Sequence, residues 1–445
     1  MPTCQRLFRK RCGRMRKENR MNERQKRWIL YWGIILSAVF LIGMVLYTWW
    51  LQIPGTIRIK AGVEETFDFH VPASGEVYLE AVEVGEFGGA VQSETLKVDL
   101  SEKLTMKSEV LTTYQMNVKL FGVVPLKQVD IQVIEDRMVM PAGVPIGIYV
   151  ETEGVLVVGV GDFKGADGVE YAPAKYIIQN GDYILKVNEE PVEGKKQFID
   201  LIEELGDEEI TLTVKRDEEQ MELKVTPKKN QNGENKIGIW VRDNAQGIGT
   251  LTFVDENGNF GALGHGINDT DTSELMKLGE GLLYKTNIIA IKKGTKGEPG
   301  ELTGMISYSN KNVIGTISDN TEAGIFGVCD AVKMPLMQDA HMYPIGLKQE
   351  IHLGDAQIIT TVDDTREFYD IEITEIRLDH DNVNRGIVIK ITDPKLLSLT
   401  GGIVQGMSGS PIIQDGKLIG AVTHVLVQDS TKGYGIFIEN MLEYN

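Results

Sequence analysis

The segment Val404-Gln405-Gly406-Met407-Ser408-Gly409-Ser410-Pro411 carries the clearest chemical signal in this chain. Gly406 and Gly409 lack a Cβ atom, so the backbone can turn sharply around Ser408 and direct amide N–H groups toward a developing negative charge. The following residues, 412–422, predict two short apolar strands joined by an Asp-Gly hairpin turn. Ser408 is therefore expected on a rigid sheet, placed as a hydrolytic nucleophile.

The two ends of the chain differ strongly in charge. The 445 residues have a net charge of −18, yet residues 1–27 carry 11 Lys or Arg against two Glu. Residues 28–51 contain no charged side chain, and a helix of that length is about 36 Å long, enough to cross a ~30 Å hydrocarbon layer. The positive-inside rule then predicts a basic cytoplasmic tail (1–27), a transmembrane signal anchor (28–51) and an extracytoplasmic remainder.

A cleaved signal peptide is the alternative interpretation of residues 28–51. The apolar run exceeds the usual length for such a peptide, and Trp49-Trp50-Leu51-Gln52 offers no small-residue cleavage site. Two of the three cysteines lie in the tail, so no disulfide can form within the exported part. Cys329 is expected as a small buried residue. No metal-ligand cluster or phosphate-binding loop is apparent, which predicts no cofactor and no metal.

Four further segments follow the anchor, and together they predict a mainly β protein. Residues 52–136 alternate short apolar and polar runs and are expected to form a small β-rich module. Residues 137–228 include a helix predicted over Lys195 to Leu205 and a strand over 210–216. Residues 229–236 are polar and predict a linker. Residues 237–445 contain many short Gly-rich strands, typical of an all-β barrel, and include Ser408.

The order of elements in residues 137–228 is similar to that of a PDZ domain of the bacterial protease type. The similarity rests on the stretch Gly181-Asp182-Tyr183-Ile184-Leu185-Lys186-Val187-Asn188, followed by the helix and the strand. It implies a carboxylate-binding loop with free backbone amides and a sheet edge open to a peptide, formed by Pro145, Ile146, Gly147 and Ile148. A scaffold that binds no peptide is the alternative.

Ser408 needs a general base, which is usually a histidine. His265 is expected at the end of a strand, between two glycines that let a substrate approach. His424 lies in an apolar strand and is interpreted as a core or wall residue. The base needs a third group to fix its tautomer, and the residues alone leave six aspartates possible: Asp269, Asp319, Asp330, Asp363, Asp364 and Asp393.

The Gly-x-Ser-Gly-x-Pro core is typical of trypsin-like serine peptidases, and the whole arrangement resembles the SpoIVB serine peptidase family of endospore formers. The likeness is carried by the basic tail, the anchor, the PDZ-like segment and the motifs at 261–265 and 401–411. It implies a chymotrypsin-like double β-barrel with His265 as base, Asp393 as orienting carboxylate and Ser408 as nucleophile. The N–H groups of Gly406 and Ser408 would form the oxyanion hole.

The resemblance also implies a biological role. Such proteins enter the forespore membrane, face the intermembrane space, cleave themselves and cut a membrane-bound regulator of an intramembrane metalloprotease, which activates a late sigma factor. The implied partners are protein substrates and other copies of the chain, with no nucleic acid. Two alternatives remain: a Deg-type quality-control protease, in which PDZ modules follow the peptidase domain, and a non-catalytic tethered PDZ adaptor.

Overall fold

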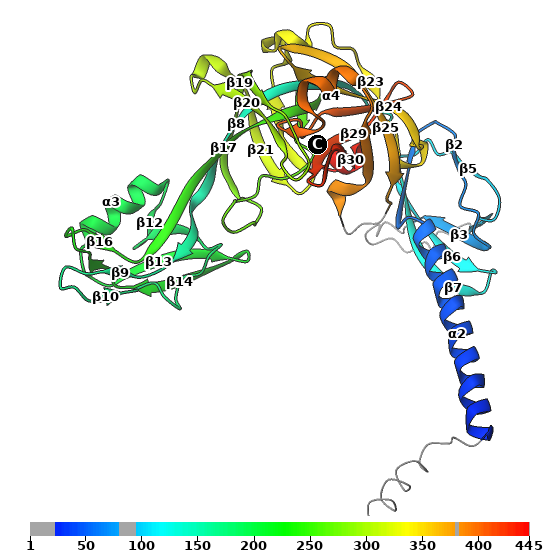
Figure 1. Ribbon diagram of the computed structural model, residues 1–445, viewed down its shortest axis with the longest axis horizontal. Coiled ribbons are helices and arrows are strands. Elements are labelled where there is room, and N and C mark those ends of the chain that lie inside the picture. Colours follow the sequence, from blue (N-terminus) through cyan, green and yellow to red (C-terminus); the bar gives the residue numbers. More distant parts are fainter. Residues whose placement is uncertain (1–22, 80–94, 379–381, 445) are drawn as a thin grey trace, which may run out of the picture. The chain divides into compact units, whose positions relative to one another are not determined.

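The computed structural model describes residues 23–79, 95–378 and 382–444. They divide into two compact units, residues 1–133 and 134–445. Most of the predicted tail lies outside the described residues. The first described element is helix α2 (Glu23–Gln52), drawn in blue in Figure 1. Its segment Arg27–Gln52 is the one described helix that is long and apolar enough to cross a membrane, which fits the anchor predicted at 28–51.

The first unit contains the predicted β-rich module. Its five-stranded sheet has the order β1-β7-β6-β3-β4, and a short pair, β2 and β5, lies beside it. The strands are β1 (Thr56–Lys60), β2 (Glu65–Phe67), β3 (Ala73–Leu79), β4 (Leu96–Asp99), β5 (Leu104–Met106), β6 (Thr113–Leu120) and β7 (Val124–Ile134). Alternate residues of β6 are buried, because successive side chains of a strand point to opposite faces of the sheet.

The second unit begins with a barrel built around β8 (Met138–Val160). The first half of β8 pairs on one side with β17 (Ile239–Val254) and on the other with β19 (Leu278–Lys292). The remaining strands are β18 (Asn259–Ala262), β20 (Gly300–Ile306), β21 (Val313–Thr321) and β22 (Gly324–Cys329). Cys329 is buried in this core, as expected, and its burial raises the pKa of the thiol to about 12.

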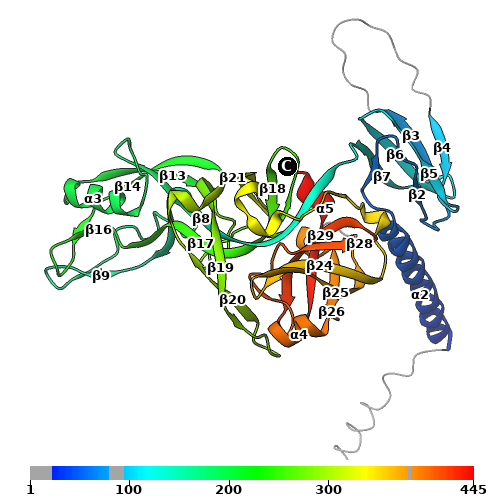
Figure 2. The ribbon, with the colours of Figure 1, turned by 90° about the horizontal axis from the view of Figure 1, so that it is seen from above.

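A second barrel follows, and it is closed. Its strand order is β24-β25-β26-β30-β29-β28, and Figure 2 shows the strands in orange and red around a common core. The bounds are β24 (Gly354–Val362), β25 (Thr365–Ile376), β26 (Ile387–Ile391), β28 (Pro411–Gln414), β29 (Lys417–Leu426) and β30 (Asp429–Phe437). Helix α4 (Pro394–Thr400) and the short strand β27 (Val404–Gln405) connect β26 to β28. The fold class is therefore mainly β with two barrels.

A third core belongs to residues 155–241, here named the inserted lobe. The second half of β8 leads into it and the first half of β17 leads back, paired side by side. Between them lie β11 (Tyr183–Val187), α3 (Lys195–Leu205), β13 (Ile210–Arg216) and β14 (Glu219–Val225). The helix and strand predicted at 195–205 and 210–216 are confirmed. The lobe does not precede the first barrel but interrupts it between its first two strands.

Two predicted segments differ from the structure. Pro145 to Ile148 do not form a loop with free amides, because this stretch lies inside β8 and is paired with β17 and β19. The interpretation as a carboxylate-binding loop is therefore wrong. The polar segment 229–236 is not an extended linker, since β15 (Lys228–Lys229) pairs with β16 (Asn235–Lys236). The N–H of Asn235 donates a 3.0 Å hydrogen bond to Glu203 of α3, which fixes this hairpin.

Candidate active site

Ser408 lies in a tight loop between β27 and β28. Gly406 and Gly409 both have φ of +98°, a conformation that side chains with a Cβ rarely adopt. A Cβ at Gly409 would also lie 2.0 Å from the carbonyl oxygen of Thr250. The prediction that glycines allow a sharp turn around Ser408 is confirmed by these φ angles. At Gly409 the close approach of β17 also leaves no room for a side chain.

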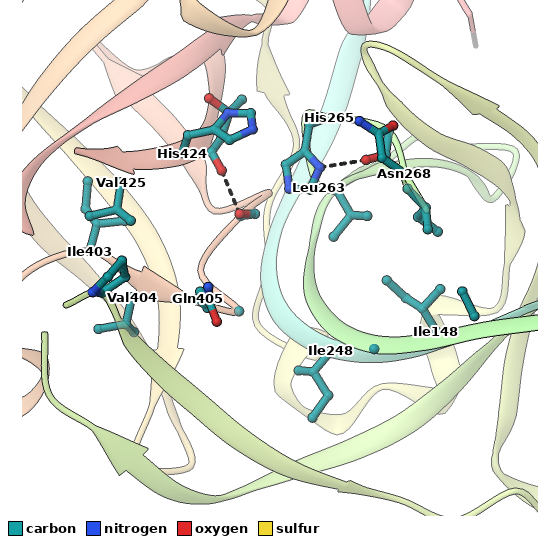
Figure 3. Close-up of a pocket in the computed structure, with 18 of the residues that line it drawn as sticks. Ile148, Ile248, Leu263, His265, Asn268, Ile403, Val404, Gln405, His424 and Val425 are labelled. Atoms are coloured by element: carbon teal, nitrogen blue, oxygen red, sulfur yellow. Dashed lines mark hydrogen bonds between the residues drawn. The ribbon is translucent and has the colours of Figure 1, made fainter. Parts of the chain in front are cut away.

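The hydroxyl of Ser408 donates a 2.6 Å hydrogen bond to the carbonyl oxygen of Thr423 on β29, shown dashed in Figure 3. The residue is half-buried, so the hydroxyl can be reached from the cleft. The backbone carbonyl of Ser408 accepts from the N–H of Thr250. Its own N–H makes no hydrogen bond within the described part of the chain, and is free to donate to a substrate oxygen.

His265 follows β18 on a turn in which Leu263 and Gly264 both have φ of +69°. Its Nδ1 lies 2.9 Å from the carbonyl oxygen of Gly266. Because a carbonyl only accepts, Nδ1 carries the proton in the neutral ring, and Nε2 keeps the lone pair that a general base requires. Burial lowers the pKa of His265 below its ordinary value, and the bond to Gly266 opposes this only partly.

His424 of β29 lines the same pocket, as a wall residue. The ring centroids of His265 and His424 are 5.0 Å apart, and Figure 3 shows both side chains at the pocket. Although part of the His424 side chain is exposed, partial burial together with the nearby His265 and Arg385 lowers its pKa to about 4. Both imidazoles are therefore neutral at pH 7, since protonating either would place a cation in a partly desolvated site.

The pocket has a volume of about 480 Å³ and lies between the two barrels. Its wall beside Ser408 is aliphatic. The Cδ1 atom of Ile403 lies 2.5 Å from the position that a Cβ on Gly433 of β30 would take, so Ile403 fills the space over that glycine. This part of the pocket is lined by Ile403, Val404, Gln405, Val425 and Val427.

A second cavity of about 420 Å³ continues the cleft past Gly406. The two cavities share residues 246–248 of β17 together with Gln405 and Gly406. The second is more polar, because Glu301 and Tyr308 contribute to its lining. The two adjoining cavities give the cleft room for several residues of a polypeptide beside Ser408.

Asp393 lies elsewhere in the second barrel. It is the N-cap of α4, where its Oδ1 accepts a 2.9 Å hydrogen bond from the N–H of Leu396. It does not line the pocket that contains His265 and Ser408, and neither do the other five candidate aspartates. Its assignment as the orienting carboxylate stays a prediction. In the described structure the acceptor on Nδ1 of His265 is the Gly266 carbonyl.

Two residues that the sequence did not single out hold the loop after His265. Asn320 of β21 donates to the carbonyl oxygens of Ile267 and Met276, each at 2.9 Å, and accepts from the N–H of Ile267 at 2.8 Å. Arg242 of β17 forms an ion pair with the buried carboxylate of Asp269. Burial would raise the pKa of Asp269, but N–H donors of Thr272 and Asp271 and the guanidinium hold it below its usual range.

No group of three or more His, Cys, Asp or Glu side chains within the described ranges is arranged to hold a metal ion. The functional groups around Ser408 include its own hydroxyl, two neutral imidazoles and backbone amides. Such groups support nucleophilic attack on a carbonyl carbon, with proton transfer through an imidazole.

The two barrels and the Ser408 and His265 cleft between them define a serine peptidase of chymotrypsin-like fold. Residues 233–442 match the family model described as SpoIVB peptidase S55. A solved structure described as "Crystal structure of Rv3671c protease, inactive form" is similar at 14% identity and a TM-score of 0.25, over 44% of this chain and 81% of that chain. No curated protein sequence matches the chain.

Proposed function

We propose that this peptidase is a membrane-anchored endopeptidase whose catalytic pair is His265 and Ser408, acting outside the cytoplasm. The observation that carries the assignment is that both residues line one cleft between the barrels, each on a turn that positive φ angles fix. The apolar helix α2 precedes both barrels and the lobe in the chain. The basic tail before that helix supports this orientation, because Lys and Arg beside a membrane span favour the cytoplasmic side.

The reaction begins when the Ser408 hydroxyl rotates from the Thr423 carbonyl toward Nε2 of His265. His265 takes the hydroxyl proton while Oγ attacks the peptide carbonyl carbon, and the N–H groups of Ser408 and Gly406 stabilise the resulting oxyanion. The proton on Nε2 then passes to the leaving amine as the peptide bond breaks. A water molecule, activated by the same imidazole, releases the acyl group from Ser408.

The test uses the full chain in lipid nanodiscs. An inactive full-length copy, Ser408→Ala, serves as substrate for the wild type and for each variant, and cleavage is followed by gel and intact mass. We expect wild-type cleavage, and losses of about 10⁴–10⁶ for the Ser408→Ala and His265→Ala variants used as enzyme. Ser410→Ala is the matched control, because its buried hydroxyl has no partner among the described residues. Cleavage by Ser408→Ala equal to that of the wild type would refute the assignment, and no cleavage by the wild type would favour the adaptor.

We further propose that the inserted lobe is a PDZ-like module that presents protein substrates, and that the peptidase serves sporulation signalling. The support is the match of residues 233–442 to the SpoIVB peptidase S55 family model and the order of β11, α3 and β13 in the lobe. In this proposal the chain cleaves itself and then a membrane-bound regulator of an intramembrane metalloprotease. A Deg-type quality-control role is the second candidate, and it predicts cleavage of many unfolded proteins.

These two roles differ in a cell that forms endospores and lacks its own S55 peptidase. If the proposal is right, the wild-type chain restores a reporter of the late sigma factor and Ser408→Ala does not. The control is Ser410→Ala, which should restore the reporter. A chain that degrades unfolded proteins in the purified assay but never restores the reporter would favour the quality-control role.

A further inference from the structure

The turn between β6 and β7 exposes apolar side chains. Phe121, Val123 and Val124 have exposed fractions of 68%, 79% and 55%. The turn is tight, with φ of +50° at Phe121 and +73° at Gly122, and the N–H of Val123 donates to Leu120 at 3.0 Å. A fixed turn with adjacent exposed apolar side chains is a place where another apolar phase can be contacted without ordering a loop.

This turn lies beside the last helical turn of α2. The ring centroids of Trp49 and Phe121 are 6.1 Å apart in an edge-on arrangement. The Nζ atom of Lys127 lies 4.4 Å above the ring of Trp50 and donates to the Ile53 carbonyl oxygen at 2.8 Å. Trp49 also packs against the core of the module. These contacts hold the β6–β7 turn at the same level along the helix axis as Trp49.

The level of Trp49 relative to a membrane follows from the length of the helix. Arg27–Gln52 has 26 residues, about 39 Å of helix, which is longer than a ~30 Å hydrocarbon core. Tryptophan prefers the boundary between hydrocarbon and headgroups. The last turn of α2, with Trp49 and Trp50, therefore lies at that boundary when the helix spans, and so does the ring of Phe121.

We propose that the β6–β7 turn inserts Phe121, Val123 and Val124 into the interfacial layer of the bilayer that α2 crosses. The partner is a lipid surface. The proposal rests on α2 spanning the membrane and is independent of the peptidase activity. With the turn inserted, the module is attached at two points, so it cannot rotate freely about the end of α2.

The test places an environment-sensitive fluorophore (NBD) at one of two sites in the full chain in nanodiscs. Cys4→Ser and Cys12→Ser leave Cys329, which is buried and unreactive because its thiol pKa is raised to about 12. Val123→Cys carries the label in the turn. Val110→Cys is the matched control, since Val110 is also apolar and 63% exposed. It lies beyond the other end of β6, whose eight residues span roughly 25 Å.

The label at position 123 is expected to emit at shorter wavelength than the label at 110, and to lose at least half of its emission when lipids with a doxyl group near the headgroup are included. The label at 110 should emit as it does in water and be unaffected. Water-like, unquenched emission at 123 would overturn the proposal. Equal quenching at both positions would also overturn it, because the whole module would then lie on the membrane without a specific contact at the turn.

Discussion

The hydroxyl of Thr250 in the first barrel donates a hydrogen bond to the carbonyl oxygen of Gly406, 2.7 Å away, in the loop that leads into β28 of the second barrel. The backbone N–H of Thr250 makes a second bond to the carbonyl of Ser408, at 3.0 Å. One buried residue of β17 thus holds both ends of the Gly406–Ser408 segment. The first barrel fixes the position of the nucleophile that the second barrel carries.

Thr250→Val should lower kcat/KM by roughly 5- to 150-fold and reduce the free energy of unfolding by about 1–3 kcal/mol. Valine keeps the shape of threonine but leaves the Gly406 carbonyl without its partner, and such a loss costs about 1–3 kcal/mol. The measurement is kcat/KM on a peptide substrate. Thr252→Val is the control, because the buried hydroxyl of Thr252 has no partner among the described residues. Equal losses in the two variants would contradict a specific role for Thr250.

Gly409→Ala should abolish activity and destabilise the peptidase unit, because a Cβ there would lie 2.0 Å from the Thr250 carbonyl oxygen at a φ of +98°. Gly416→Ala is the comparison. Gly416 also has positive φ, +73°, but has nothing within 4 Å, so the strain alone costs about 1–2 kcal/mol. Thermal unfolding and peptide cleavage measure both effects. A Gly409→Ala protein as active and stable as Gly416→Ala would show that the loop is not held against β17.

Local sequence was enough to predict the parts of the structure that depend on neighbours in the chain. The apolar spacing over Lys195 to Leu205 gives α3, and the Asp415-Gly416 turn joins β28 to β29. The insertion of the lobe could not be predicted in this way. β8 is one continuous strand of 23 residues that enters two cores, and its partners on β17 lie 79 to 114 residues further along the chain. Pro145 to Ile148 were predicted as a loop because their strand partners, in β17 and β19, are also distant in the sequence.

The residues of the candidate site likewise fall into those with a local sequence signal and those without one. Ser408 and His265 have glycines beside them, which is a local signal. Thr250, Asn320 and Arg242 act on partners 27 to 156 residues away, and nothing in their own surroundings marks them. Asp393 has a local signal of its own, because an aspartate followed by Pro394 is typical of a helix N-cap.

The pH dependence of catalysis should reflect the lowered pKa of His265. Burial disfavours the charged ring, so the neutral base persists as the pH falls through the ordinary histidine value of 6.5. The acidic limb of kcat/KM is therefore expected below that value, measured on a peptide that does not titrate between about pH 4 and 8. His352→Gln is the control, because Asp415 raises the pKa of this distant histidine, and its loss should not move the limb. A wild-type midpoint above 6.5 would contradict the assignment of the base.

The aliphatic wall beside Ser408 should make the enzyme prefer small aliphatic residues on the acyl side of the cleaved bond. Val425→Ala shortens a half-buried side chain that lines this pocket, so selectivity for leucine over valine at that position should rise about tenfold. Peptide pairs that differ only at this residue give the ratio of kcat/KM. Ile419→Val, a buried core change away from the pocket, should leave the ratio unchanged. An unchanged ratio in Val425→Ala would show that this wall does not contact the substrate.

Substitution of Asp393 separates a cap from a catalytic carboxylate. Its Oδ1 accepts from the N–H of Leu396 at the start of α4, and α4 leads through Gly401 to the serine loop. Asp393→Ala should therefore lower the free energy of unfolding by about 0.5–2 kcal/mol, while Asp393→Asn, which also caps well, should recover most of it. Activity should follow stability in both variants.

An orienting role for Asp393 predicts a different pattern. The asparagine variant would then be as stable as the wild type yet lose about 10⁴ in kcat, because an amide in place of the carboxylate selects the wrong histidine tautomer. Parallel measurement of thermal unfolding and kcat in Asp393→Asn therefore decides the matter. Stable but inactive protein would mean that the cleft rearranges before catalysis to bring this aspartate to His265, whereas stable and active protein would leave the Gly266 carbonyl as the group that holds Nδ1.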